Sequence, residues 1–221
     1  AAAVPSVEWG EAVGIAVVVR QGHEQPSEQE LKELIRARLR SSRVPDKVVP
    51  RLAKYRVGFC DVTSPTNERS LVATLIPPGC VAGDKVPTVS FAAEDEWALT
   101  VWLAVANSFA MDYIARKKVA LKMSYTVLDS LPFPRVGGTD PIAKTLVPLV
   151  IRLACCGPEM TAFWNARAGE GWCEPVSADG SPPGAEDPDE RFHLRAQIDA
   201  IVARDVFGLT RDELACILDT F

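Results

Sequence analysis

The chain has 221 residues, 48% of them hydrophobic, which is enough for one large domain or two small ones with a real core. Its formal net charge of −5 excludes a protein that binds polyanions over its whole surface. Residues 51–135 carry ten Lys and Arg against eight Asp and Glu, whereas residues 136–221 carry seven against 14. Any contact with nucleic acid is therefore expected from a local patch in the middle third.

No run of 18 apolar residues occurs, and the first residues lack the basic and apolar regions of a signal peptide. We therefore expect no membrane span, and a cytoplasmic protein with reduced thiols. The six cysteines show no CxxC spacing and no nearby histidine, which argues against a zinc site. Adjacent Cys155 and Cys156 fall in an apolar helix, where packing is the simpler interpretation and a redox role the alternative.

The first 50 residues predict a small β-α-β unit. The apolar run AVGIAVVVRQG is typical of a buried strand. A helix follows, with Ser27 and Glu30 as a capping box and an apolar stripe along one face. The segment RVPDKVV then returns as an extended chain. We predict a separate domain over residues 1–50.

Residues 51–136 predict a short mixed sheet backed by one long helix. The stretch YRVGFCDV alternates apolar and polar residues as a half-buried strand does, and SLVATLI and KVPTVSF indicate two more strands. A single helix is expected over 96–118, with an acidic start and a basic end that suit its dipole. The segment ALKMSYTVLDSLPFPR indicates a further strand that leads into a turn.

Residues 137–221 predict a helical tail, so the fold class is α+β. Asp140 is an N-cap, and Pro148 predicts a kink or the start of a new helix. The segment EPVSADGSPPGAEDPDE predicts a mobile linker with little to bury. The next helix ends at Gly208, and a capping box of Thr210 and Glu213 opens the last one.

No catalytic constellation is found, because the chain has no phosphate-binding Gly loop, no HExxH and no GxSxG. His23 and His193 are interpreted as surface residues. Asn and Arg on the TNER turn have the donors and acceptors that read adenine and guanine edges, and a basic helix end has the groups that bind phosphates. The candidate DNA contacts are Thr66, Asn67, Arg69, Arg116, Lys117, Lys118, Lys122, Ser124 and Tyr125. The alternative is a purely structural turn and a basic helix end, which composition alone favours.

The stretch FCDVTSPTNERSLVATLIPPGCVAGDKVPTVSF resembles the C-terminal part of adenine-specific DNA methyltransferases of the type IIG restriction–modification and phage-defence kinds. WLAVANSFAMDYIARKKV, MSYTVLDSLPFPR, GPEMTAFWN and the last 28 residues continue the resemblance in order, so that it covers residues 51–221. It implies a DNA-contact and target-recognition region. The catalytic motif and the S-adenosylmethionine motif of that family lie upstream and are not in this chain, so we expect no cofactor and no methyltransferase activity here.

Residues 1–50 are similar to the C-terminal subdomain of acyl-adenylate-forming ligases such as acyl-CoA synthetases. That family continues into a Gly–Lys element, whereas this chain runs into PRLAKYRVGF, in which Lys54 has other surroundings. We therefore expect no ligase activity, and a junction of two pieces near Pro50. The predicted partner is double-stranded DNA, bound weakly by the chain alone, together with a separate methylase core. A truncated ligase fragment and an inert fusion product are the alternatives.

Overall fold

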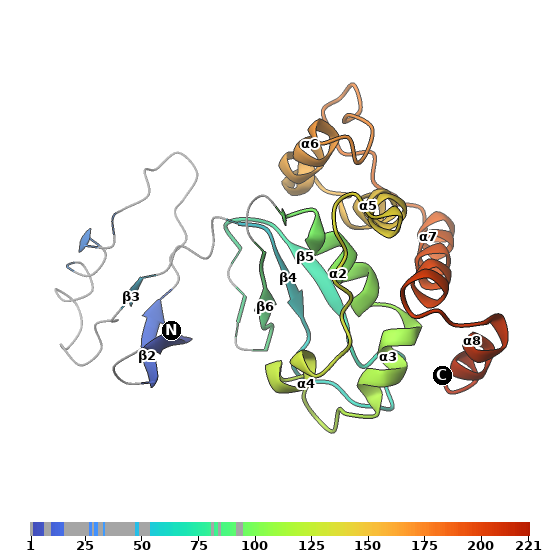
Figure 1. The fold of residues 1–221 in the computed structure, drawn as a ribbon. Coiled ribbons are helices and arrows are strands. Elements are labelled where there is room, and N and C mark those ends of the chain that lie inside the picture. Colours follow the sequence, from blue (N-terminus) through green and yellow to red (C-terminus); the bar gives the residue numbers. More distant parts are fainter. Residues whose placement is uncertain are drawn as a thin grey trace. The chain divides into compact units, whose positions relative to one another are not determined.

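A computed structural model of the chain describes residues 2–6, 10–15, 27, 29–30, 33, 47–48, 54–80, 82–83, 85–91 and 95–221. The chain divides into two compact units (Figure 1). Unit 1 comprises Ala1–Lys54 and Pro78–Val81, and unit 2 comprises Tyr55–Pro77 and Ala82–Phe221. The predicted candidate contacts all belong to unit 2.

Unit 1 contains three short strands. Strands β1 (Ala2–Ser6) and β2 (Gly10–Ile15) pair antiparallel, and β3 (Lys47–Val48) lies parallel to β2. Strand β2 falls at the start of the predicted apolar strand, and the parallel pairing of β3 is the one that a β-α-β unit requires. Strand β1 was not predicted.

The predicted capping box of unit 1 is confirmed. The Ser27 N–H donates to Glu30 Oε2 at 2.7 Å, and the Glu30 N–H donates to Ser27 Oγ at 3.2 Å. Both bonds satisfy amide donors that a helix start leaves free. The apolar stripe of this helix and His23 lie outside the described residues.

Unit 2 begins with a three-stranded sheet that is antiparallel, so the prediction of a mixed sheet was wrong. Strand β4 (Arg56–Phe59) lies between β5 (Ala73–Ile76) and β6 (Thr88–Val89). All four residues of β4 are buried, which overturns the predicted half-buried alternation. The reason is the central position of β4, where Gly58 leaves a space that side chains of its neighbours, Ile76 and Val86, cover.

The predicted helix over 96–118 was also wrong, because two helices replace it. Helices α2 (Ala98–Ala106) and α3 (Phe109–Arg116) meet at an angle of 61°. At the break, Asn107 Oδ1 accepts from the Ala73 N–H at 2.9 Å and Asn107 Nδ2 donates to the Ala73 carbonyl at 3.0 Å. Ser108 then caps α3 by accepting from the Met111 N–H. The side chain of Asn107 thus pairs with the edge of β5 as another strand would.

Among the described helices, no single one has the length and apolar character of a membrane span, although the bent pair α2 and α3 has them together. Most of α2 is buried inside unit 2.

The segment after α3 forms a short helix in place of the predicted strand. Helix α4 (Tyr125–Asp129) begins at Ser124, whose Oγ accepts from the Val127 N–H at 3.3 Å. Of the extended structure expected here, the described residues retain an isolated antiparallel bridge between Val62 and Lys122. The Ser124 cap stabilises a helical turn here, and this outweighs the preference of the β-branched residues for a strand.

The helical tail begins as predicted. Asp140 Oδ1 accepts from the Ile142 N–H at 2.8 Å and caps α5 (Pro141–Ala154), which continues through Pro148 as one helix. A 3-10 turn, η4 (Pro158–Met160), leads into α6 (Thr161–Gly169).

Helix α7 (Pro188–Ile201) passes into a π-helical turn, η5 (Val202–Val206), and the chain turns at Gly208 with a φ of 66°. Helix α8 (Arg211–Leu218) opens with the predicted capping box of Thr210 and Glu213, which is confirmed.

The segment between α6 and α7, predicted as a linker with little to bury, is anchored at Ala185. The Ala185 N–H donates to the Arg152 carbonyl at 2.8 Å, and Arg191 Nη1 donates to the Ala185 carbonyl at 2.7 Å. Ala185 is 1% exposed. The first of these bonds satisfies a carbonyl in the last turn of α5, where helix carbonyls otherwise lack partners.

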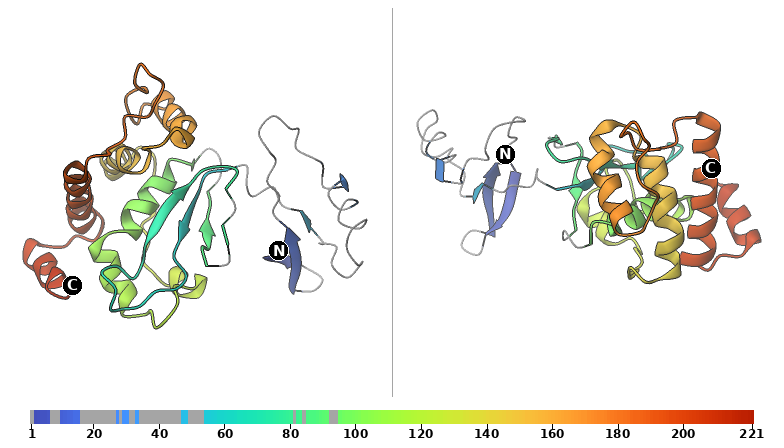
Figure 2. Two further views of the ribbon diagram at one scale, coloured as in Figure 1. Left: turned by 180° about the vertical axis from the view of Figure 1, so that it is seen from behind. Right: turned by 90° about the horizontal axis from the view of Figure 1, so that it is seen from above.

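The core of unit 2 forms in layers, so that the sheet packs on α2, α2 on α5, and α5 on α7 (Figures 1 and 2). Leu99, Val105, Leu146 and Ile151 are fully buried where α2 meets α5. The tail helices therefore belong to the same compact unit as the sheet. The α+β fold class is confirmed.

Candidate nucleic-acid interface

The TNER sequence lies on a turn, residues 63–70, that connects β4 to β5 and is closed by its own side chains. Thr63 Oγ1 donates to the Ser70 carbonyl at 2.7 Å, which joins the two ends of the turn. Inside it, Ser64 Oγ and Thr66 Oγ1 lie 2.8 Å apart. The turn is thus a compact loop whose ends meet at the sheet.

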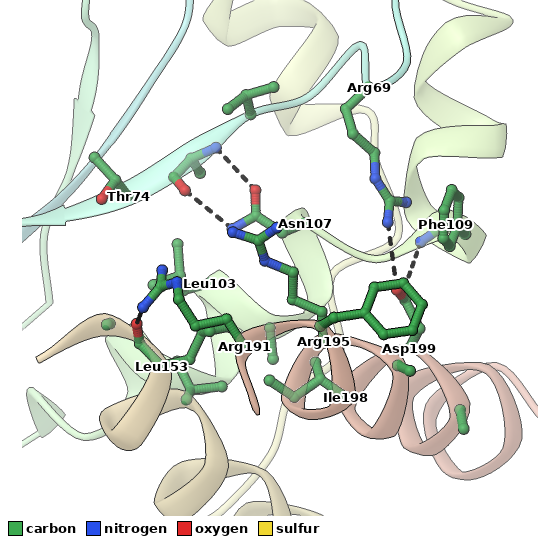
Figure 3. A pocket seen from close by; sticks show the side chains of 18 of the residues that line it. Arg69, Thr74, Leu103, Asn107, Phe109, Leu153, Arg191, Arg195, Ile198 and Asp199 are labelled. Atoms are coloured by element: carbon green, nitrogen blue, oxygen red, sulfur yellow. Dashed lines mark hydrogen bonds and ion pairs between the residues drawn. The ribbon is translucent and has the colours of Figure 1, made fainter. Parts of the chain in front are cut away.

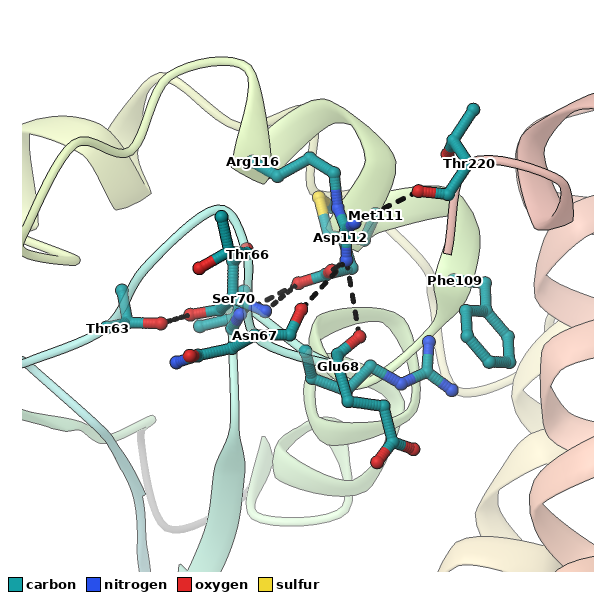
Figure 4. A network of polar contacts seen from close by, with 12 residues as sticks. Thr63, Thr66, Asn67, Glu68, Ser70, Phe109, Met111, Asp112, Arg116 and Thr220 are labelled. Atoms are coloured by element: carbon teal, nitrogen blue, oxygen red, sulfur yellow. Dashed lines mark hydrogen bonds and ion pairs between the residues drawn. The ribbon is translucent and has the colours of Figure 1, made fainter.

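A buried carboxylate holds the backbone of this turn in place (Figure 4). Asp112, on α3, is fully buried. Its Oδ1 accepts from the Ser70 N–H at 2.7 Å and from the Leu71 N–H at 2.8 Å. Its Oδ2 accepts from Arg116 Nη2 at 2.7 Å, four residues further along the helix. Three strong donors compensate the burial of one negative charge.

Arg116 completes what we call the Asp112–Arg116 clamp. Its Nη2 also donates to the Glu68 carbonyl at 3.2 Å and reaches the Asn67 carbonyl at 3.5 Å. The Phe221 ring covers the guanidinium at 3.6 Å, and the side chain is only 10% exposed. Arg116 therefore acts on the backbone of the turn and is not available for a phosphate.

Arg69 also points into the protein and not toward solvent, where the predicted DNA contact would require it. Its Nη2 pairs with Asp199 Oδ2 at 3.3 Å, and its guanidinium lies 3.2 Å from the centre of the Phe109 ring. Burial lowers the pKa of Arg69, and burial raises the pKa of Asp199 although the Phe109 N–H and Arg69 act against that rise. The guanidinium remains charged, since an Arg side chain does not lose its proton in proteins. Arg69 thus ties the turn to α7.

Thr66, Asn67 and Glu68 form the exposed tip of the turn. Within the described part of the chain, the Asn67 side-chain amide makes no hydrogen bond, while its backbone is held by the clamp. A side chain with a free donor and a free acceptor on a fixed backbone is suited to reading a base edge.

The basic segment after α3 lies beside this turn. The Thr63 N–H donates to the Leu121 carbonyl at 3.2 Å, and Lys122 bridges to Val62. The side chain of Lys122 is 60% exposed, and its Nζ lies 3.8 Å from Asp61. Lys117 is exposed and lies 5.1 Å from the Tyr113 ring. The structure therefore places the exposed side chain of Lys122 at the base of the turn, and Lys117 is exposed at the end of α3.

The other three candidates make local structural contacts. Lys118 Nζ donates to the Ser130 carbonyl at 2.8 Å and so joins α3 to α4. Ser124 caps α4. The Tyr125 hydroxyl accepts from the Thr88 N–H at 3.0 Å and donates to the Thr88 carbonyl at 3.1 Å, which satisfies the free edge of β6.

Sequence reasoning missed Asp112, which determines the conformation of the turn. The available signal was a charged residue in an otherwise apolar helix segment, FAMDYIAR, because buried carboxylates need dedicated partners. No local pattern identifies those partners, since Ser70 and Leu71 are more than 40 residues away in the sequence.

No protein-family model, no curated protein and no solved structure matches this chain. Among the described residues, no group of three or more His, Cys, Asp or Glu side chains is placed to hold a metal ion.

Proposed function

We propose that this chain is the DNA-contact and target-recognition region of an adenine-specific DNA methyltransferase or restriction–modification protein. One observation carries the proposal, namely a turn with a fixed backbone that exposes the Asn67 side chain and whose base is paired with the segment that carries Lys122. Methyl transfer, to the exocyclic amine of a flipped adenine, belongs in this proposal to a separate methylase core.

The division of labour follows from the chemistry of the two kinds of group. Lysines bind phosphates at any sequence and fix the register of the protein on the duplex. An Asn amide donates and accepts at once, which matches the N7 and N6 atoms of adenine in the major groove. The clamp reduces the entropy lost on binding, because the turn is ordered before DNA arrives.

The ordered resemblance of residues 51–221 to methyltransferase C-terminal regions supports the proposal. The acidic composition of residues 136–221 predicts that the chain alone binds DNA weakly, because like charges repel the phosphates. S-adenosylmethionine would be held by the catalytic core, so this chain contributes positioning.

A selection of bound duplexes from a random pool, followed by sequencing, tests the proposal. The wild-type chain is expected to enrich duplexes that share an adenine-containing site. Asn67→Ala is expected to relax the preference at one position by about 1–3 kcal/mol. The matched control, Asn165→Ala on the exposed face of α6, is expected to leave the preference unchanged.

Two results would contradict the proposal. One is recovery of the input pool without enrichment at low salt. The other is an unchanged base preference in Asn67→Ala, which would remove the turn from base recognition even if the chain binds DNA.

A further inference from the structure

Unit 2 contains a groove of about 650 Å³ that the proposed DNA contacts do not use (Figure 3). Its walls are the start of β5 with the preceding residues, helix α2, the end of α5, and the faces of α7 and α8. Leu103, Val150 and Ile198 are among the many apolar side chains that line it. Concave, mostly apolar spaces of about 300–1,000 Å³ with a few polar groups are typical of small-molecule sites.

Two guanidinium groups of this groove have N–H donors without an acceptor among the described residues. Arg195, an exposed residue of α7, makes no hydrogen bond or ion pair with any described residue. Arg69 Nη1 is buried and has no hydrogen-bond partner in the described part of the protein. A buried donor without an acceptor costs free energy, so an anion that enters here would relieve it.

The other polar groups of the groove are already satisfied. Arg191 Nη1 donates to the Leu153 carbonyl at 2.9 Å and to the Ala185 carbonyl at 2.7 Å. Both ends of the Asn107 amide are bonded to Ala73. A polar group of a ligand would therefore be bound mainly by Arg195, because the Arg69 guanidinium is already paired with Asp199.

Large apolar side chains around the groove are exposed to solvent. Val72, Phe192 and Leu218 are 51%, 68% and 42% exposed, and they come from the loop before β5, from α7 and from α8. Exposed apolar surface that converges on one concave site marks a binding site more often than scattered single residues do.

We propose that this groove binds a small amphipathic anion, with an apolar body against α2 and α7 and a carboxylate, sulfonate or phosphate head on Arg195. Charge complementarity decides the class of ligand, because Arg195 offers a positive charge without a partner beside an apolar floor. The proposal does not depend on DNA binding, since the proposed DNA contacts Asn67, Lys117 and Lys122 do not line the groove.

Two fluorescent probes of similar shape test it on the full chain, the anion 1-anilinonaphthalene-8-sulfonate and the neutral N-phenyl-1-naphthylamine. The wild type is expected to bind the anion saturably at one site. Arg195→Gln is expected to weaken binding of the anion by about tenfold or more and to leave the neutral probe unchanged, because a charged hydrogen bond is lost. Arg211→Gln, an exposed Arg at the start of α8, is the matched control and should change neither.

Ala196→Trp is a second variant. It replaces an exposed Ala of α7 that lines the groove with a side chain large enough to fill the groove. Both probes should lose affinity in this variant, while its circular dichroism spectrum and melting temperature stay those of the wild type. Octanoate and octyl phosphate serve as competitors. Whichever of them displaces the anionic probe at the lower concentration shows whether the groove prefers a carboxylate or a phosphate. Equal binding of the anion by wild type and Arg195→Gln, absence of saturable binding, or displacement by neither competitor would overturn the proposal.

Discussion

At the scale of single residues, buried charges decide which candidate contacts are free for a ligand. Asp112 and Asp199 each hold one Arg of the sequence-predicted set, so Arg116 and Arg69 face the protein. Among the described residues, Lys117 has no carboxylate partner, and Lys122 makes a looser pair with Asp61 at 3.8 Å while its side chain stays 60% exposed. The number of Lys and Arg residues in the sequence therefore overstates the positive charge that is available at the surface.

Asp112→Asn tests the clamp directly. The substitution is expected to lower the free energy of unfolding by about 3–5 kcal/mol, because the Arg116 guanidinium loses its carboxylate while it stays buried. Urea unfolding followed by tryptophan fluorescence measures this in unit 2, which holds four of the five tryptophans.

Asp129→Asn is the control for that measurement, since Asp129 is exposed at the end of α4, and its effect should lie within about 0.5 kcal/mol. A loss of less than about 1 kcal/mol in Asp112→Asn would mean that the turn does not depend on the clamp.

Cys155 is a second residue whose behaviour follows from burial. It is fully buried at the end of α5, and burial raises the pKa of its thiol to about 12, with Cys156 and Cys173 adding to the rise. Because the folded pKa exceeds the unfolded one, the stability that the neutral thiol contributes is full below about pH 8.5 and is lost as pH rises toward 12. The thiolate is the reactive form, so the folded protein protects this residue.

Alkylation with iodoacetamide at pH 8, read out by peptide mass spectrometry, checks this. Cys216, which is exposed on α8, is expected to be modified within minutes, and Cys155 only after unfolding in urea. Equal rates at the two positions in the folded protein would show that the end of α5 opens readily.

At the scale of elements, local signals in the sequence were sufficient for three helix starts but not for the break between α2 and α3 or for the start of α4. The caps at Ser27, Asp140 and Thr210 depend on residues two or three positions away, and all three were predictable. The break at Asn107 depends on Ala73, which is 34 residues away, and nothing near Asn107 indicates that partner. The apolar pattern continues across Asn107, so the sequence predicts one helix where the structure has two.

The candidate site shows the same limit. The turn and its residues Thr66 and Asn67 could be predicted, because Ser, Thr, Pro and Asn favour a turn between two strands. The inward position of Arg69 could not, because its partner Asp199 lies 130 residues further along the chain. Helix α4 was missed because Tyr125, Thr126 and Val127 favour a strand, whereas the Ser124 cap outweighs that preference.

The segment between α6 and α7 gives a further test at this scale. Gly184 lies against the backbone of Cys155 and Cys156, so that a Cβ at this position would come within 2.8 Å of Cys156 Cα. Gly184→Ala is therefore expected to destabilise unit 2 by about 1–3 kcal/mol, since rigid backbone must move.

Thermal unfolding by circular dichroism measures the effect of Gly184→Ala, with Gly137→Ala as the control because a Cβ there meets nothing within 4 Å. Equal melting temperatures of the two variants would indicate that the segment is loosely attached, as the sequence alone had suggested.

At the scale of the whole molecule, the chain consists of two compact units whose boundary, between Lys54 and Tyr55, falls close to the junction expected near Pro50. Unit 2 combines the sheet, the turn and the helical tail around one core. The 63–70 turn therefore belongs to the same compact unit as the helical tail. In the proposed function, the negative net charge of residues 136–221 would repel DNA, so a local basic patch would supply the attraction.

The most direct test of the account is the salt dependence of duplex-DNA binding, measured by fluorescence anisotropy from about 20 to 200 mM salt. We predict that wild-type affinity falls with salt and that Lys117→Gln/Lys122→Gln reduces the slope of log K against log salt by about 1.8, since each lost phosphate contact removes about 0.9. Lys144→Gln, on the exposed face of α5, should leave the slope unchanged. No duplex binding at the lowest salt, or the same slope in the double variant, would contradict a DNA-contact surface at the 63–70 turn.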